Sequence, residues 1–95
     1  MSYYKFTACR VSGDGNAIFP DEIIIDNDEE VVIHRKPKLI GSKETKFSFG
    51  AIASVEFEKS LIFVDIIIET RGGRTIVARG FTRSDANDIR QLLSF

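Results

Sequence analysis

The feature that most constrains the fold of this chain is a run of alternating apolar residues that leads into a glycine turn. Branched aliphatic residues occupy every second position, at Ile62, Val64, Ile66 and Ile68. This spacing predicts a strand with one buried face. Two glycines and a second apolar run follow, so the chain is expected to turn back and pair with itself. The segment 61–81 is therefore predicted to be a long β-hairpin.

The length of the hairpin loop decides which side chains share a face. A two-residue loop at Gly72–Gly73 would place Ile66 opposite Arg79 and bring a charge onto the apolar face. A three-residue loop at 71–73 places Ile66 opposite Ala78 instead. Because a slip of one residue moves every side chain to the other face, the apolar pattern favours the longer loop. Its last glycine would then take the left-handed conformation.

The C-terminal segment has the pattern of an amphipathic helix. Apolar residues recur at helical spacing, at Ala86, Ile89 and Leu93. Thr82 is the predicted N-cap, since Asp85 follows three residues later as in a capping box, and Ser84 is the competing cap. A single helix with one apolar face needs a sheet to pack on, and the hairpin supplies part of one.

Shorter strands are predicted in the rest of the chain. They cover Tyr3–Val11, Glu22–Asp26, Val31–Arg35, Lys46–Phe49 and the alternating stretch around Val55 and Phe57, with residues 17–19 as a further candidate. Asp26–Glu29 is predicted to be a tight turn, and Pro37 and Gly41 are expected to interrupt strand pairing. Six or seven antiparallel strands and one terminal helix predict a mainly β fold. This would be a curved roll or partly closed barrel with the helix over one open end.

Length and composition narrow the function classes. Ninety-five residues predict a single domain over 1–95. A net charge of −1 lacks the global attraction to nucleic acid that strongly basic domains have. A lone cysteine excludes an internal disulfide, and there is neither a visible leader nor an apolar run long enough to span a bilayer. The expected location is the cytoplasm.

Residues for catalysis or metal binding are sparse. Cys9 and His34 are the only cysteine and histidine, and they lie on separate predicted strands. A nucleophile needs a base within reach and a third group to orient that base, and a zinc site needs more ligands than these two. We therefore expect no enzyme activity, no metal and no cofactor.

Charge is segregated along the chain. Asp21–Glu30 holds six acids and no base, whereas the segment 35–46 holds five cations and one acid. The cations are the candidate binding residues, namely Arg35, Lys36, Lys38, Lys43 and Lys46. On a flexible loop they would steer association with an acidic protein surface. They would equally bind anionic lipid headgroups, with an attraction of about 1 kcal/mol for each cation near the surface. A further alternative is that they are solvated and lie beside the acidic hairpin.

Three segments resemble the pleckstrin-homology-like (PH-like) superfold, above all its small bacterial members. They are Phe47–Glu56 with its Ile-x-x-Val rhythm, the Ile66–Gly73 hairpin, and the Gly80–Phe81 entry into the terminal helix. The resemblance implies a barrel of seven strands in two sheets, with one end closed by the helix. Members of this superfold have varied binding roles, so the function must be sought in the site.

These observations together predict a non-enzymatic binding or assembly module. It would mediate protein interaction or self-association through an exposed strand edge, expected where Pro37 and Gly41 break regular pairing. The alternative is peripheral binding to an anionic membrane surface through the basic loop at 35–46. No nucleic-acid partner is expected, because no aromatic residues interleave with the lysines to form a stacking surface. The sequence indicates no small-molecule substrate.

Overall fold

The computed structural model describes residues 3–9, 20–37 and 41–94, which form two antiparallel sheets and one α-helix. The first sheet has the order β1-β2-β3-β4, with β1 at Tyr3–Thr7, β2 at Glu22–Asp26, β3 at Val31–Pro37 and β4 at Ser42–Ser48. A 3-10 turn at Phe49–Ala51 leads to the second sheet, with β5 at Ile52–Lys59, β6 at Phe63–Thr70 and β7 at Thr75–Thr82. Helix α1, Arg83–Leu92, follows directly. The predicted mainly β, PH-like fold is confirmed.

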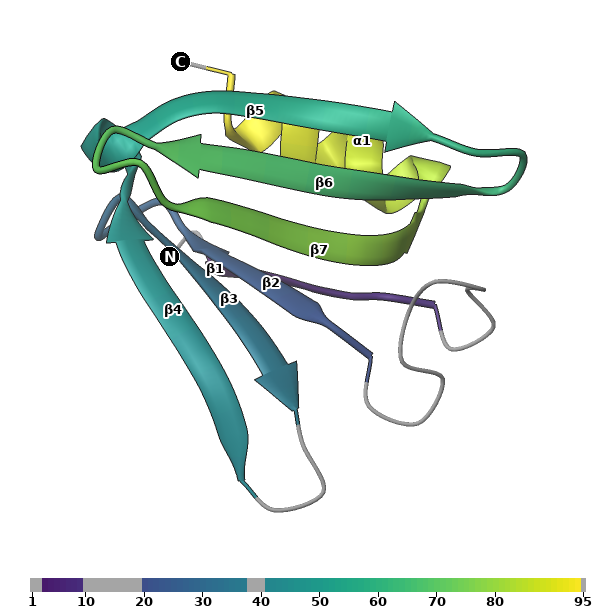
Figure 1. The fold of residues 1–95 in the computed structure, drawn as a ribbon, viewed down its shortest axis with the longest axis horizontal. Coiled ribbons are helices and arrows are strands. Elements are labelled where there is room, and N and C mark those ends of the chain that lie inside the picture. The colour runs from purple at the N-terminus through teal and green to yellow at the C-terminus, as the bar shows by residue number, and fades with distance from the viewer. Residues whose placement is uncertain (1–2, 10–19, 38–40, 95) are drawn as a thin grey trace.

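The two sheets meet at one side and diverge at the other (Figure 1). The chain joins them where β4 passes into β5, and α1 lies behind β5 and β6 in this view. A second junction lies near the end of β1, where the Cys9 N–H donates to the Gly80 carbonyl at 2.7 Å. Among the described strands, β7 pairs in register only with β6. The barrel is therefore open along β7.

Two carboxylates accept hydrogen bonds from the backbone of β7, one on each side of the strand. Asp21 accepts from the Arg79 N–H at 3.2 Å through its Oδ2 atom, and its backbone carbonyl accepts from the Ala8 N–H at 2.8 Å. Asp65 accepts from the Gly80 N–H at 3.0 Å. Gly80 has φ +84°, a left-handed conformation that glycine adopts without strain. The Asp21 and Cys9 bonds tie the C-terminal half of β7 to the segments that flank β2 and β1, whereas Asp65 lies on β6 and its bond stays within the second sheet.

The hairpin register and the helix cap are confirmed. Ile66 pairs with Ala78 and Gly73 has φ +89°, as the three-residue loop requires. Thr82 caps α1, since its hydroxyl accepts from the Asp85 N–H at 3.1 Å, so the competing cap was wrong. The buried alternation does not extend to Ile62, which is 67% exposed. The reason is that β6 begins only at Phe63, so Ile62 lies in the projecting turn.

The strand limits in the first sheet differ from the prediction. β4 begins at Ser42, four residues before the predicted start, and Pro37 pairs with Ser42. Proline is tolerated there because it is the last residue of β3. Pairing therefore continues as far as Pro37 and Ser42, so the expected interruption of pairing was wrong. Among the described strands, β4 pairs only with β3 and is an edge of the first sheet. The strand candidate at 17–19 and Lys38 lie outside the described residues.

One apolar core joins both sheets and the helix. Its most deeply buried members are Ile23, Ile25 and Val32 from the first sheet, Val64, Ile66, Ile68 and Phe81 from the second, and Ile89 from α1. At about 1.5–3 kcal/mol for each buried aliphatic side chain, this shared burial dominates the stability of the fold. Over the ranges that the structure describes, no helix has the length and apolar character of a membrane-spanning segment.

Candidate functional site: a basic hollow between the sheets

The predicted basic residues do not form one loop, because most of them lie on paired strands. Successive side chains of a strand point to opposite faces. Lys36 is an even number of residues from the buried Val32, so both side chains lie on the face of β3 that points into the open barrel. Lys43 is the cross-strand partner of Lys36 and faces it from β4. Arg35 and Lys46 lie on the outer face. The pleat thus divides the predicted set in two.

The outer residues are unsuited to form a site. The Arg35 guanidinium lies 3.6 Å from Glu22 and 3.7 Å from Glu44, so its charge is neutralised. Lys46 is exposed and its cross-strand partner is Ile33. Neither residue converges with the inner pair.

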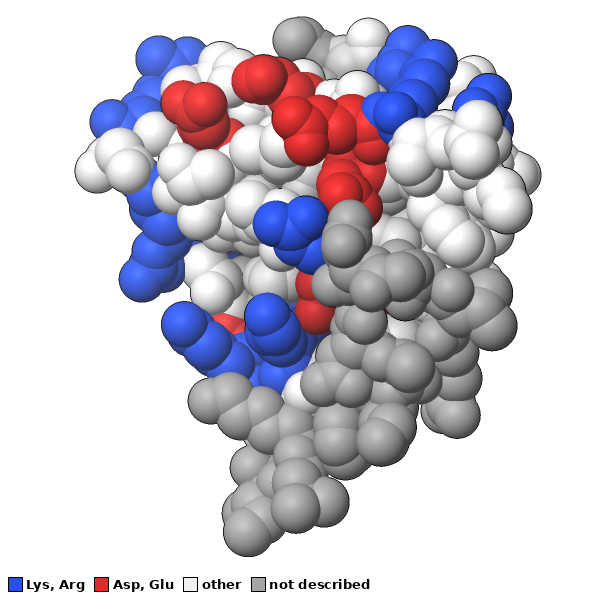
Figure 2. Space-filling view, turned by 45° about the vertical axis from the view of Figure 1, so that its right-hand side comes forward, with Lys and Arg blue, Asp and Glu red and all other residues white. Residues whose placement is uncertain are grey.

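The inner pair lines a hollow that we call the basic hollow. Lys36 and Lys43 are direct cross-strand partners, and Arg74 faces them from the start of β7. The hollow has a volume of about 190 Å³ and is lined by His34, Lys36, Lys43, Thr45, Arg74, Thr75, Ile76 and Val77. Figure 2 shows one group of Lys and Arg side chains low on the molecule, with a few Asp or Glu atoms beside it, and further Lys and Arg side chains on both sides of the acidic group near the top. The site therefore brings together cations from both sheets.

The charges of the basic hollow are largely uncompensated. Like charges directly opposite one another in a sheet are destabilising. Among the described residues, no carboxylate forms an ion pair with Lys36, Lys43 or Arg74. Such a cluster attracts an anion.

His34 and Asp21 lie at the inner end of the basic hollow. The His34 Nε2 atom is 3.8 Å from Asp21 Oδ2, too far for a hydrogen bond, and it has no hydrogen-bond partner among the described residues. Burial by itself would raise the pKa of the Asp21 carboxyl. His34 and the Arg79 N–H outweigh that effect, so the pKa of Asp21 is lowered. The positive charge of Lys36 contributes in the same direction, so Asp21 is held as an anion that supports the closed junction and partly offsets the charge of the hollow.

The opposite wall of the basic hollow is a free strand edge. The Arg79 N–H points away from β6, because it donates to Asp21. Backbone groups along a strand alternate in direction, so the N–H groups of Val77 and Thr75 point the same way. In the part of the chain that the structure describes, these two residues have no strand partner on that side. The hollow therefore offers both cations and backbone hydrogen-bonding groups.

Sequence reasoning found Lys36 and Lys43 but missed Arg74 and His34. Arg74 follows the hairpin turn and is remote in sequence from the basic segment, so only the packing of the two sheets reveals its role. His34 was interpreted as a strand residue, which is correct, and it shares the inner face with Lys36. Among the described residues, no hydrogen bond or ion pair joins His34 and Cys9.

Comparison with known proteins gives one match. The model of a family described as bacterial PH domain matches residues 6–94. Searches of curated proteins and of solved structures find no match to the chain. PH-like domains generally serve as binding modules, which agrees with a site that has binding groups but no catalytic constellation among its described residues. The chain belongs to the bacterial PH domain family.

Proposed function

We propose that the protein is a non-enzymatic module that binds an acidic, extended segment of a partner protein in the basic hollow. One observation carries this proposal: Lys36 and Lys43 face each other across a strand pair, with Arg74 opposite them, and among the described residues no carboxylate forms an ion pair with any of the three. The partner segment would supply the missing negative charge. Its expected setting is the cytoplasm.

The form of the partner follows from the edge of β7. An added strand forms main-chain hydrogen bonds with an unpaired edge, while its alternate side chains supply specificity. Thr75 and Val77 provide such an edge beside the cations. Acidic residues at every second position of an added strand would therefore point together toward Lys36 and Lys43. A segment of alternating acidic and apolar residues is the best match to the hollow.

Self-association is the case in which the partner is a second copy. The turn after β2 and its flanking residues, 26–30, carry four of the acids of the chain. Glu29 and Glu30 of that turn are exposed. An acidic turn of one copy meeting the basic hollow of another would make a heterologous contact. Light scattering over a dilution series measures this: a mass that rises with concentration supports it, and a constant monomer mass leaves foreign partners.

The proposal is tested with a synthetic peptide of alternating glutamate and valine and a matched peptide of alternating glutamine and valine. We expect the acidic peptide to bind, to bind less tightly as salt is raised, and to lose at least about tenfold in affinity in the K36E/K43E variant. The control is K46E, which reverses an exposed lysine on the outer face and should leave binding nearly unchanged. Isothermal titration calorimetry gives each affinity.

Three outcomes would contradict the proposal. Equal binding of the acidic and glutamine peptides would remove the role of charge. Equal loss in K46E and K36E/K43E would show a general charge effect instead of a site. Binding of anionic vesicles that depends on Lys36 and Lys43, without any binding of the acidic peptide, would favour the membrane alternative for the same residues.

A further inference from the structure

The turn between β5 and β6 carries an exposed apolar pair. Leu61 is 94% exposed and Ile62 is 67% exposed, the two most exposed large apolar side chains among the described residues. They are adjacent, and Figure 1 shows their hairpin extending past the end of the helix. Single exposed aliphatic residues are ordinary on protein surfaces. Two adjacent ones on a projecting turn form a small apolar patch, which favours contact with a membrane or with an apolar protein surface.

Hydrogen bonds hold this turn in its projecting form. The Ser60 N–H donates to the Phe63 carbonyl at 2.8 Å, and the Ser60 hydroxyl donates to the same carbonyl at 3.0 Å. The Arg83 Nη2 atom donates to the carbonyls of Ser60 and Leu61 at 3.1 and 3.3 Å. These bonds brace the turn against α1. The apolar pair is therefore presented to solvent by a defined structure.

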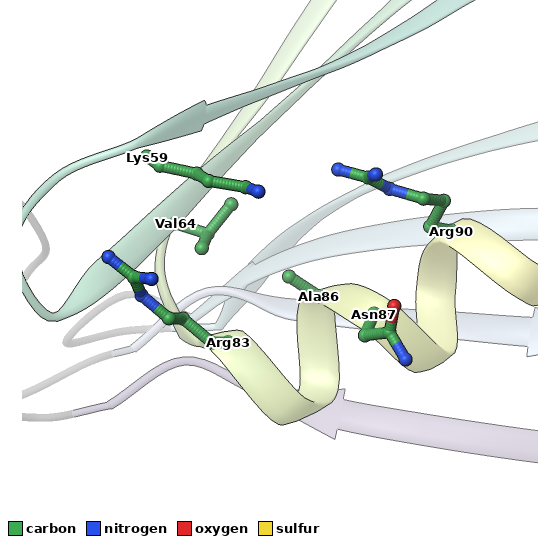
Figure 3. A pocket seen from close by; sticks show the side chains of 6 residues that line it. All are labelled: Lys59, Val64, Arg83, Ala86, Asn87 and Arg90. Carbon is green, nitrogen blue, oxygen red and sulfur yellow. The ribbon is translucent and has the colours of Figure 1, made fainter.

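Three cations surround a small pocket just behind the turn. Lys59, Arg83 and Arg90 line a cavity of about 100 Å³ together with Val64, Ala86 and Asn87. Figure 3 shows the Lys59 and Arg90 heads pointing toward each other across the space above Ala86, whereas the Arg83 head is directed away from them, toward the turn whose carbonyls it binds. The Arg90 guanidinium also lies 4.7 Å from the centre of the Phe57 ring. Among the described residues, none of the three cations forms an ion pair with a carboxylate.

From this juxtaposition we propose that the β5–β6 turn and its pocket form a membrane-docking site. Leu61 and Ile62 enter the interfacial layer of a bilayer, and the pocket takes the phosphate of an anionic phospholipid headgroup. The apolar pair and the cations adjoin on one end of the second sheet, as an amphiphilic surface requires. A purely soluble anion would leave the apolar pair without a role. A purely apolar partner would leave the facing Lys59 and Arg90 and the neighbouring Arg83 unneutralised.

This site shares no lining residue with the basic hollow. It lies at the Phe63 end of β6, whereas the hollow lies beside the hairpin that follows the Thr70 end. The inference therefore does not depend on the proposed function, and each can fail alone. Glu58 is exposed on the neighbouring face of β5, so the attraction depends on the pocket cations and not on a wholly basic surface.

The expected binding is reversible and has two components. Burial of aliphatic side chains favours the bilayer, so loss of both from a partly inserted turn should reduce partition about tenfold. Each cation near an anionic surface contributes about a fivefold change in partition, which salt reduces. The apolar component should persist on neutral vesicles, and the charge component should appear only on anionic ones.

The experiment measures co-sedimentation with vesicles of phosphatidylcholine alone and of phosphatidylcholine with phosphatidylglycerol. We expect tighter binding to the anionic vesicles, a loss of about tenfold in L61S/I62S, and a loss of about fivefold in K59Q on anionic vesicles only. The matched control is K46Q, which removes an exposed lysine elsewhere and should retain binding. Leu61 and Ile62 are exposed, so their replacement leaves the core intact, and circular dichroism checks this.

A second arm separates lipid from free anion. Inorganic phosphate is titrated while amide NMR shifts of Lys59, Arg83 and Arg90 are followed, and weak shifts at these residues support the pocket. The proposal is overturned if phosphate occupies the pocket but wild-type protein ignores both vesicles. It is equally overturned if L61S/I62S binds vesicles as the wild type does. Loss of vesicle binding in K36E/K43E, with the turn variants unaffected, would move the membrane contact to the basic hollow.

Discussion

The facing lysines of β3 and β4 allow the cost of the basic hollow to be measured in the free protein. Cross-strand partners such as Lys36 and Lys43 have Cβ atoms about 4.5–5.5 Å apart. If the two ammonium groups lie roughly 7 Å apart, they repel by about 0.6 kcal/mol in water. Reversing one charge replaces this repulsion with a similar attraction. K43E is therefore expected to increase the free energy of unfolding by about 1 kcal/mol, or roughly 4–8 °C in Tm.

The control for this prediction is K46E, which changes the net charge equally. The cross-strand partner of Lys46 is Ile33, so this variant relieves no facing repulsion. Thermal and urea unfolding of the three proteins at low salt should order them with K43E the most stable. The gain should shrink as salt is raised, because exposed charges are screened. A K43E protein no more stable than K46E at low salt, or a gain indifferent to salt, would refute the reasoning.

Two further predictions concern the closed junction. The pKa of Asp21 is lowered in the folded protein from its ordinary value of 3.8, so its contribution to stability is present above that value and is lost as pH falls through the folded-state pKa. D21N should therefore be less stable than the wild type near pH 6, and urea unfolding should show this difference shrinking toward pH 3; a constant difference would contradict it. Gly80 has φ +84°, so G80A should lose about 1–2 kcal/mol in the same assay. The control G50A, where an added Cβ meets nothing within 4 Å, should change little, and equal losses would refute a role for the left-handed backbone.

The second half of the fold was predictable because its signals are local. The pairing of Ile66 with Ala78 follows from alternation and loop length, and the start of α1 follows from Thr82 and the Asp85 N–H that it caps. The limits of β4 were harder to predict. Proline and glycine near a hairpin indicate interruption, yet Pro37 occupies a strand end where a missing N–H is tolerated.

The candidate site was only half predictable for a different reason. Once β3 and β4 are known to be paired, the period of two places Lys36 opposite Lys43 and separates them from Arg35 and Lys46. No local pattern brings Arg74 to them, because that contact depends on how the second sheet crosses the first. The exposure of Ile62 was missed because its residue type fits the buried alternation, which begins only after it, at Val64.

The open edge of β7 is a consequence of how its other half is closed. At Arg79 the outward N–H is taken by the Asp21 side chain, and at Gly80 the outward carbonyl is taken by Cys9, so the junction uses individual bonds instead of a continuous ladder. A continuous ladder of hydrogen bonds would have paired the first sheet with the whole length of β7, and the outward backbone groups of Thr75 and Val77 would then be buried. The junction instead joins β7 to the first-sheet side only around Arg79 and Gly80, and among the described strands it leaves Thr75 and Val77 without a partner on that side. The hollow and the β5–β6 turn lie at opposite ends of β6, so the proposed partner site and the proposed membrane-docking site would not compete. K36E/K43E and L61S/I62S should accordingly act independently, each removing one kind of binding and leaving the other.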